Sequence, residues 1–330
     1  RGALLLGLLA ACGAGADAPA ADPPPPAAAP AATACPGPQV GPRQPWRHGS
    51  SRAVSTLAGD AAHAADDAIV NPGSSASIEG KFAYGTVSKD LEGEDVTLWL
   101  QVRCGVWKPI TSARTDGDGR ARFTVDASHI PAVGAYAFEL VVLGDGTRAQ
   151  GHIYVAPRGT PAVLFDVDGT LTTGDGQLIV EVLGGDANLR PGAVDVVRKH
   201  VAAGALPIYM TGRSYNLRQM TRDWLRRHGF PRGPLLTTRT IGQALPGGGR
   251  VGKFKRQQIE ILRDGAGLDI RYAYGNATTD VCAYADAGLP PERTYIVGKH
   301  AGEACAGHAP TQPIGDYRDH LAVLDQLLAN

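Results

Sequence analysis

The sequence predicts an α/β protein: a doubly wound parallel sheet preceded by a small antiparallel β-sandwich. In the middle of the chain, apolar and polar residues alternate with period two, which is typical of half-buried strands. From Pro161 onward, short apolar runs alternate with helical stretches, which favours a parallel sheet covered by helices. The length of 330 residues fits two domains at roughly 100–200 residues each.

The composition excludes several classes of protein. Lys and Arg total 32, as do Asp and Glu, so the formal net charge is zero; no strongly basic surface is indicated, and nucleic acid is not expected as a partner. Hydrophobic residues make up 43% of the chain, enough for sizeable cores, which excludes wholesale disorder. The longest apolar run, from Ala3 to Ala11, is far shorter than the roughly 20 residues of a membrane-spanning helix.

The N-terminal segment predicts export. Residues 1–11 have the apolar run of a signal peptide. Leu9-Ala10-Ala11-Cys12 resembles the lipobox of bacterial lipoproteins, which implies cleavage before Cys12 and acylation of its thiol. The resemblance implies a protein exported to a bacterial cell envelope and anchored on a membrane surface by acyl chains. Residues 12–45, rich in Ala and Pro, are predicted to be a semi-extended linker.

Residues 46–157 are predicted to form the β-sandwich domain. Apolar residues alternate with polar ones in several short runs, and Gly-rich turn sequences such as Asp116-Gly117-Asp118-Gly119 separate them. The expected strands include Val96–Val102, Ala121–Val125, Tyr136–Val142 and Ile153–Val155. No set of catalytic residues stands out in this region.

Four cysteines besides Cys12 could pair in an oxidising compartment. They are Cys35, Cys104, Cys282 and Cys305. We expect a disulfide between Cys282 and Cys305, because both belong to the last third of one domain. Four buried free thiols are the alternative interpretation.

Residues 158–330 are predicted to form the doubly wound domain. Strands are expected at 162–165, 206–210, 234–236, 270–274 and 294–297, and helices at 190–203, 215–228, 253–263 and 278–287. Ligands of such folds bind beyond the carboxyl ends of the strands, so the polar residues that close each strand are the candidate site. Within the second helix, Arg218, Arg222 and Arg226 recur every four residues and predict a solvated helix face.

Four groups of polar residues follow these strands in order. They are Asp166-Val167-Asp168-Gly169-Thr170, Thr211-Gly212-Arg213, the helix-opening Lys253 and Lys255, and Gly275-Asn276 with Asp280. Together they resemble the four motifs of the haloacid dehalogenase superfamily. The resemblance implies hydrolysis of a phosphomonoester through an aspartyl-phosphate.

Each residue type has a chemical role in that reaction. Asp166 is the expected nucleophile, and Asp168 the expected general acid and base. Thr211 and a lysine are expected to bind the phosphoryl oxygens; Lys255 is favoured, but spacing leaves Lys253 open. The remaining expected substrate-binding residues are Gly169, Thr170, Gly212, Arg213 and Lys253.

A cluster of carboxylates repels a phosphate dianion, so a hard divalent cation is expected as cofactor, namely Mg²⁺. Its expected ligands are Asp166, the backbone carbonyl of Asp168, Asn276 and Asp280. Only 43 positions separate Asp168 from Thr211, and 42 separate Thr211 from Lys253, which leaves no room for a large cap domain. An open site suits a headgroup at a bilayer surface.

Further motif detail resembles the lipin/Ned/Smp homology domain, in particular the C-terminal domain of retinal-degeneration-B type phosphatidylinositol transfer proteins. The matching segments are Asp166–Thr172, Arg190–Ala193, Tyr209–Arg213, Trp224–Leu225, His228–Pro231, Lys253–Lys255, Tyr274–Asp280 and Tyr295–Gly298, within about 161–324.

The two branches of this family imply different functions. Lipins are Mg²⁺-dependent phosphatidate phosphatases. In the transfer proteins the matching domain lacks the paired aspartates and is thought to bind phosphatidic acid without hydrolysing it. Asp166 and Asp168 are both present here, which favours a phosphatase acting on phosphatidic acid. A non-catalytic module for phosphatidic acid or phosphoinositide, and a phosphatase for soluble phosphomonoesters, are the alternatives.

Overall fold

The computed structural model describes residues 35–85, 88–174, 176–182, 184–244 and 249–328. The predicted signal peptide, the acylation of Cys12 and most of the predicted linker lie outside the described residues. Residues 36–330 form one compact unit. Within the described ranges, no helix combines the length and apolar character that crossing a membrane requires.

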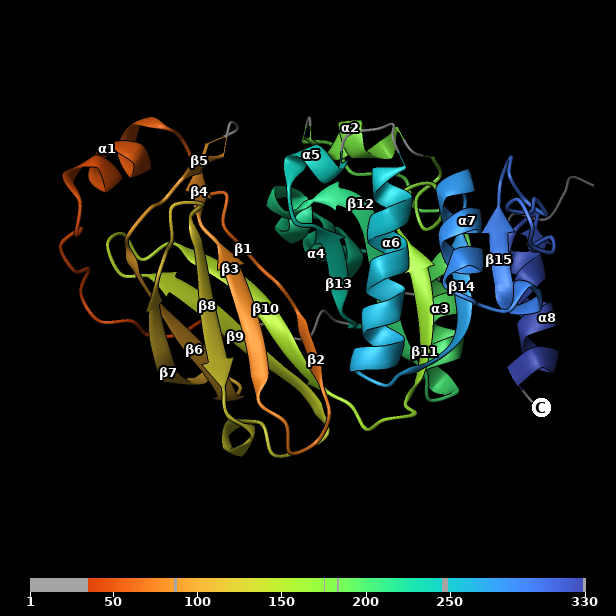
Figure 1. The fold of residues 1–330 in the computed structure, drawn as a ribbon, viewed down its shortest axis with the longest axis horizontal. Helices are drawn as coiled ribbons and strands as arrows, with labels where there is room; N and C mark the ends of the chain where they lie inside the picture. Colours follow the sequence, from red (N-terminus) through yellow and green to blue (C-terminus); the bar gives the residue numbers. More distant parts are fainter. Residues whose placement is uncertain (1–34, 86–87, 175, 183, 245–248, 329–330) are drawn as a thin grey trace, which may run out of the picture. The chain divides into compact units, whose positions relative to one another are not determined.

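The N-terminal half of this unit is a β-sandwich (Figure 1). One sheet has the order β1 (Ala64–Ala65), β3 (Ala76–Lys81), β8 (Arg120–Val125). The other has the order β2 (Ala68–Val70), β10 (Arg148–Val155), β9 (Gly134–Val142), β6 (Asp95–Arg103), β7 (Val106–Arg114). The predicted antiparallel sandwich is confirmed, with one difference: β2 pairs with β10 in parallel.

Apolar side chains from both sheets fill the space between them. Ile78 and Phe123 come from the first sheet and Leu98, Leu140 and Ile153 from the second, all at most 2% exposed. These are the inward positions of the period-two pattern, as expected for a sandwich. Short elements complete the domain: α1 (Gly49–Leu57), β4 (Ala83–Tyr84), β5 (Lys89–Asp90) and η1 (Ala127–His129).

Residues 36–45, assigned to the linker from composition, lie against the sandwich. The indole N–H of Trp107 donates to the carbonyl of Pro36 at 2.8 Å. The backbone N–H of Gln44 donates to the carbonyl of Leu143 at 2.9 Å. Backbone groups of this segment thus form hydrogen bonds with the sandwich. Amino-acid composition alone does not predict these contacts.

The C-terminal half is a six-stranded parallel sheet in the order β13-β12-β11-β14-β15-β16. Its strands are β11 (Pro161–Asp166), β12 (Leu206–Ser214), β13 (Leu235–Thr238), β14 (Asp269–Gly275), β15 (Thr294–Val297) and β16 (Gln312–Ile314). Its helices are α2 (Gln177–Val182), α3 (Ala193–Ala202), α4 (Arg218–Arg227), α5 (Ile241–Ala244), α6 (Arg250–Glu260), α7 (Thr278–Asp286) and α8 (Tyr317–Leu328), with short turns η2 (Tyr215–Leu217), η3 (Ile261–Gly265) and η4 (Pro291–Arg293).

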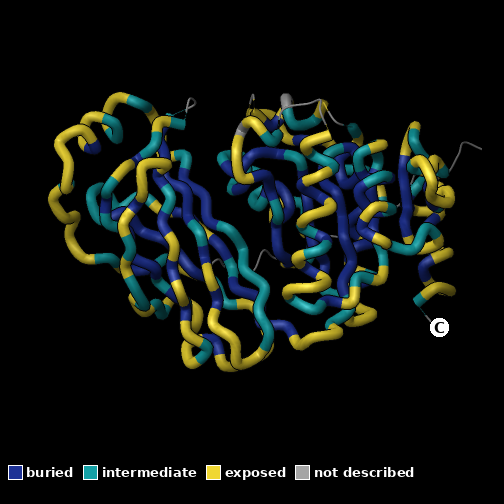
Figure 2. The backbone as a smooth tube through the Cα atoms, in the orientation of Figure 1, coloured by how far each residue is buried: buried dark blue, intermediate teal, exposed yellow. Residues whose placement is uncertain are grey.

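Helices cover both faces of this sheet, as the doubly wound prediction requires (Figure 1). Along β11, Val163 and Phe165 face the core shared with α3, α4 and α8, including Trp224 and Leu324. Leu164 faces the opposite core, shared with α6 and α7. Figure 2 shows these strands as the buried centre of the domain. Burial on both faces explains the continuous apolar run of this strand.

All five predicted strands of the sheet are confirmed, but β16 and α8 were not predicted. β16 is three residues long and contains the exposed Pro313, so it carries little pattern. It lies at the edge of the sheet, where proline is tolerated. α8 packs Leu324 on the core beside α3.

The prediction of a solvated arginine face on α4 is wrong for two of its three residues. Arg218 pairs with Asp66 at 2.5 Å, and Arg222 pairs with Asp67 at 3.1 Å. Only Arg226 keeps a largely exposed side chain, at 71%. Two of the three arginines on this helix face therefore contact the β-sandwich domain, and Arg226 remains in solvent.

Asp67 connects the two domains through a fully buried carboxylate. It accepts hydrogen bonds from the Arg222 guanidinium, from the backbone N–H of His152 at 2.7 Å and from that of Leu235 at 2.9 Å. Burial alone would raise its pKa, but the charges of Arg222 and His152 together with these hydrogen bonds lower the pKa below its ordinary value. Both oxygens of the Asp67 carboxylate therefore have hydrogen-bond donors, as a buried charge requires.

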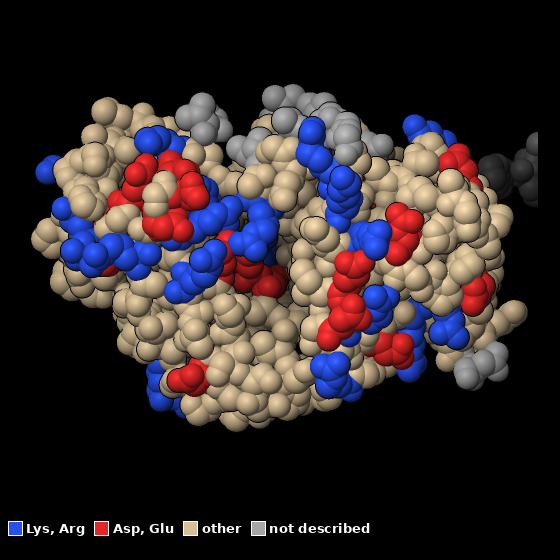
Figure 3. Space-filling view, in the orientation of Figure 1, with Lys and Arg blue, Asp and Glu red and all other residues tan. Residues whose placement is uncertain are grey.

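Surface charges are mixed in sign. Figure 3 shows Lys and Arg side chains beside Asp and Glu side chains over both domains, in line with a formal net charge of zero. The predicted disulfide is confirmed: Cys282 on α7 is bonded to Cys305 in the segment before β16.

We predict that Asp67→Ala lowers the free energy of unfolding by about 3–5 kcal/mol at pH 7, because Arg222, whose side chain is only 15% exposed, loses its carboxylate partner. Because folding lowers the pKa of Asp67, its contribution is full above the unfolded value of 3.8. The contribution disappears as pH falls through the folded pKa. Urea unfolding followed by tryptophan fluorescence measures both effects. The exposed Asp126, changed to Ala, is the control, and an equal loss in both variants would contradict the prediction.

We predict that replacing Cys282 and Cys305 together with Ser lowers the free energy of unfolding by about 3 kcal/mol. The bond closes a loop of 23 residues in the unfolded chain, and its removal restores that loop's conformational entropy. Thermal denaturation of the double variant beside the unmodified chain measures the change. An unchanged midpoint would show that the disulfide does not constrain the unfolded state.

Candidate active site

The site is built around the carboxyl end of β11, the central strand. Asp166 is its last residue, and the Asp166 side chain is only 4% exposed. The chain then turns through Gly169, whose φ of 74° is left-handed and disfavours any side chain. The Gly169 N–H donates to the hydroxyl of Thr172 at 2.9 Å, which fixes the turn. The turn places Asp166 and Asp168 on one edge of the sheet.

Lys255 bridges the first and last motifs. Its ammonium donates to Asp166 Oδ1 at 2.5 Å and to Asp280 Oδ1. All three side chains are at most 4% exposed. Lys253, two residues earlier on α6, is exposed and points away from this cluster by helical geometry. The structure therefore favours Lys255 over Lys253 as the lysine of the site.

Burial and charge shift the titration of these groups. Burial raises the pKa of Asp166 to about 8; the nearby charges of Asp280 and Asp168 add to the rise, and Lys255 opposes it. Burial would lower the pKa of Lys255, but Asp166 and Asp280 outweigh it and hold that pKa above its usual range. One ammonium thus faces two carboxylates, which leaves an excess of negative charge in a dry site. A further cation or a proton stabilises such a cluster.

Asp280 is positioned by the start of α7. Its Oδ2 accepts the backbone N–H groups of Asn276 and Ala277, each at 3.1 Å, so the carboxylate caps the helix. Gly275 is needed here, because a Cβ on it would lie 2.5 Å from the Cβ of Asp280. The Gly-Asn-x₃-Asp spacing therefore encodes a close approach between strand β14 and helix α7.

The hydroxyl of Thr170 lies between a residue of the first motif and a residue of the last motif. It is fully buried and lies 3.1 Å from Asp166 Oδ2 and 3.2 Å from Asn276 Oδ1. Thr170, predicted to bind substrate, thus contacts the predicted nucleophile and a predicted metal ligand. A role for Thr170 in substrate binding stays a prediction.

The carboxylate of Asp168 faces Arg213 and Thr211. The Thr211 hydroxyl donates to Oδ2 at 2.8 Å. The Arg213 guanidinium donates from Nε and Nη2 to both carboxylate oxygens, at 2.8–3.1 Å. Such a two-pronged contact fixes the carboxylate plane. With a side chain 21% exposed, Asp168 is more accessible than Asp166, so it faces the entrance of the site.

Arg213 was predicted to bind substrate, and the structure places it behind Asp168. Its side chain is fully buried, and a second carboxylate, Glu181 of α2, pairs with it at 2.7 Å. Burial raises the pKa of Glu181, while Arg213 opposes that rise. Direct contact between Arg213 and substrate stays a prediction; its observed contact is to the predicted general acid.

Two residues of the site were missed from the sequence. Glu181 lies in a short helix with no motif around it, and its partner is 32 positions away, so no local signal marks it. Arg190 belongs to one of the segments that resemble the family, Arg190–Ala193, but the sequence pattern indicates no role for it. Its guanidinium donates to the carbonyls of Gly169 at 2.7 Å and Thr170 at 3.2 Å, which braces the turn after β11.

The donor set fits a hard divalent cation in its chemistry. Asp166, Asp280, Asn276 and the backbone carbonyl of Asp168 offer only oxygen atoms, which Mg²⁺ prefers. Lys255 shows that Asp166 and Asp280 present oxygens to one point. Within the described ranges, no group of three or more His, Cys, Asp or Glu side chains is placed to hold a metal ion. The set therefore depends on the amide and the carbonyl as well as on two carboxylates. Gly212, beside Thr211, packs closely on Val251: a Cβ at this position would lie 3.0 Å from a Val251 methyl group, so a larger residue would require Val251 to shift.

Comparison with known proteins identifies both domains. Residues 163–298 match the family model described as "PITM 1-3, LNS2 domain", and residues 61–155 match "PITM 1-3, beta-sandwich domain". Membrane-associated phosphatidylinositol transfer protein 2 of Homo sapiens is 33% identical over 78% of this chain and 18% of its own length. Protein retinal degeneration B of Drosophila melanogaster is 31% identical over 86% of this chain and 22% of its own length. The chain thus spans about a fifth of the length of these relatives.

We predict that Lys255→Met lowers the free energy of unfolding by about 3–5 kcal/mol in the presence of EDTA, because two buried carboxylates lose their shared cation. Lys253→Met removes the same charge from an exposed position of the same helix and should change it by less than about 0.5 kcal/mol. Chemical denaturation compares the two variants. Equal effects would contradict the assignment of Lys255 to the buried cluster.

Proposed function

Since residues 163–298 form a haloacid dehalogenase-like domain of the LNS2 type, we propose that the chain is a Mg²⁺-dependent phosphomonoester hydrolase. Its proposed substrate is phosphatidic acid at a membrane surface, where the predicted anchor at Cys12 holds the protein. The observation that carries the proposal is the pair Asp166 and Asp168 at the end of β11, with Lys255 in contact with Asp166. The names of the relatives support a phospholipid as partner.

In the proposed first step, a carboxylate oxygen of Asp166 attacks phosphorus and the ester P–O bond breaks. Asp168 gives its proton to the departing alcohol oxygen. In the second step, Asp168 takes a proton from water, which attacks phosphorus, releases inorganic phosphate and restores Asp166. Bound Mg²⁺ would offset the negative charge shared by the carboxylates and the phosphoryl group.

The surrounding residues support this sequence of roles. Thr211 and Arg213 hold the Asp168 carboxylate in one orientation, which a general acid needs. The Lys255 ammonium lies beside Asp166, where negative charge shifts between the carboxylate and the phosphoryl group during the proposed transfer. Thr170 donates to Oδ2 of Asp166 and Lys255 to Oδ1, so the orientation of that carboxylate is fixed.

A non-catalytic module for anionic phospholipid is the second candidate function. Two observations favour it: the relatives are named as transfer proteins, and Asp166 is nearly buried with a raised pKa. Vesicle flotation separates the two. Binding of phosphatidic acid vesicles that survives Asp166→Asn, without phosphate release by the unmodified chain, would favour the binding module.

We predict Mg²⁺-dependent phosphate release from phosphatidic acid vesicles, and a loss of roughly 10³-fold or more in kcat for Asp166→Asn, because the nucleophile is removed. Arg256→Met is the control, since Arg256 is an exposed cation of the same helix outside the predicted site and its replacement leaves the buried cluster intact. A panel of soluble phosphomonoesters assayed in parallel tests a soluble substrate. No Mg²⁺-dependent release from any of these substrates would reject the hydrolase proposal.

A further inference from the structure

A pocket lies at the junction of the two domains, away from the candidate active site. Its volume is about 360 Å³, within the range of small-molecule sites. Thr160, which precedes β11, and Leu206 and Pro207, which begin β12, line its floor. Asp166 and Thr211 lie toward the opposite ends of the same two strands. The pocket therefore lies at the amino ends of these strands, and it shares no residue with the candidate active site or the proposed metal site.

The walls of this pocket are apolar. The sandwich domain contributes Val133, Ala135 and Val155, and the α/β domain contributes Val201 and Leu206. Val133 is 63% exposed and Val201 is 37% exposed, so two of the large apolar side chains left in contact with solvent meet at this pocket. An apolar chain placed between them would remove that surface from water.

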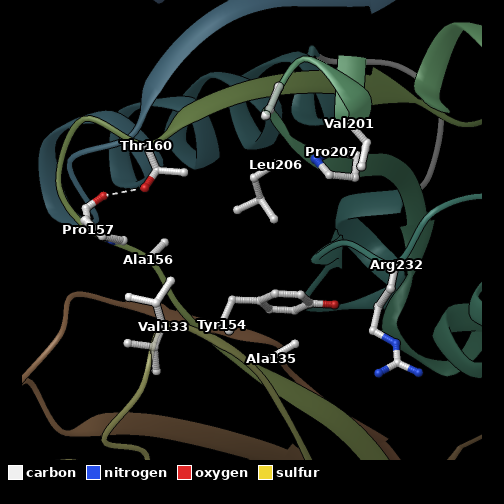
Figure 4. A pocket seen from close by; sticks show the side chains of 14 residues that line it. Val133, Ala135, Tyr154, Ala156, Pro157, Thr160, Val201, Leu206, Pro207 and Arg232 are labelled. Atoms are coloured by element: carbon white, nitrogen blue, oxygen red, sulfur yellow. Dashed lines mark hydrogen bonds between the residues drawn. The ribbon is translucent and has the colours of Figure 1, made fainter. Parts of the chain in front are cut away.

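Two polar side chains, Tyr154 and Arg232, line this apolar surface. The hydroxyl of Tyr154 is buried and makes no hydrogen bond. Arg232 is exposed, lines the pocket, and has no carboxylate partner among the described residues. Figure 4 shows the Tyr154 ring crossing the pocket with its hydroxyl directed toward the side where Arg232 lies.

An unpaired buried hydroxyl is rare in folded proteins and calls for an explanation. Burial raises the pKa of Tyr154, so the hydroxyl keeps its proton and can donate it in a hydrogen bond. A tyrosine hydroxyl and a guanidinium are both donors, and together they suit a planar anion with two acceptor oxygens. A carboxylate has that shape and charge.

We propose that this junction pocket binds a small amphipathic carboxylate. Its apolar chain lies among Val133, Val201 and Leu206, and its carboxylate accepts the Tyr154 hydroxyl and pairs with Arg232. The site takes residues from both domains, so the bound carboxylate links them. This proposal is independent of the hydrolase proposal, because no residue is shared.

Calorimetric titration of the full chain with decanoate, kept below its micellar concentration, tests the proposal. We expect one binding site, with 1-decanol and decyltrimethylammonium binding at least about tenfold more weakly, because neither offers an acceptor anion. Failure of decanoate to bind, or equal binding of the decyl cation, would overturn the proposal.

Variants locate the site. Arg232→Gln and Tyr154→Phe should each weaken decanoate binding by about fivefold to tenfold. Ala135→Trp places a bulky side chain at an exposed lining position and should abolish it. Arg103→Gln, an exposed arginine outside the pocket, is the control and should bind like the unmodified chain. Undiminished binding by Arg232→Gln or by Ala135→Trp would overturn the assignment.

Two further measurements separate this site from a structural role and from the active site. Tyr154→Phe should keep the melting temperature of the unliganded chain, because its hydroxyl makes no hydrogen bond there; a lowered melting temperature would mean that the hydroxyl has a structural partner. Asp166→Asn should bind decanoate unchanged. Loss of binding in that variant would place the carboxylate in the candidate active site and overturn the proposal.

Discussion

The contact of one buried ammonium with two buried carboxylates organises the α/β domain. Lys255 comes from α6, Asp166 from β11 and Asp280 from α7, so the contact ties together three elements that the chain order separates. Burying three charged groups is costly unless each has a partner, and here every one does. When both carboxylates are ionised, the cluster carries an excess negative charge, which is the electrostatic condition for attracting a cation.

A second group of paired charges orients Asp168, the predicted general acid, and a third connects the two domains. Arg213 lies between Asp168 and Glu181, and Arg222 lies on Asp67. In each case a largely buried guanidinium contacts a carboxylate, and its planar geometry restricts the motion of the pair more than a lysine would. The β-sandwich is therefore part of the support of the α/β domain, since Asp67 also receives the N–H of Leu235 in β13.

The sequence predicted the strands of the sheet and the residues at their ends, because buried parallel strands and strand-end motifs leave local patterns. It did not predict the partners of Arg218 and Arg222, because Asp66 and Asp67 are about 150 positions away and helical spacing alone indicates solvent. Glu181 was missed for the same reason. Spacing also could not choose between Lys253 and Lys255, a choice that depends on which side of α6 packs on the sheet.

The covalent link at Cys282 has a consequence for the site two residues before it. Asp280 and Cys282 share the first turns of α7, and Cys305 fixes that helix to the segment preceding β16. In reducing surroundings the thiols separate, and the helix that presents Asp280 to Lys255 loses its tie. The arrangement of the carboxylates is thus linked to whether the surroundings oxidise or reduce cysteine. The site keeps its geometry best in oxidising surroundings, where the disulfide is stable.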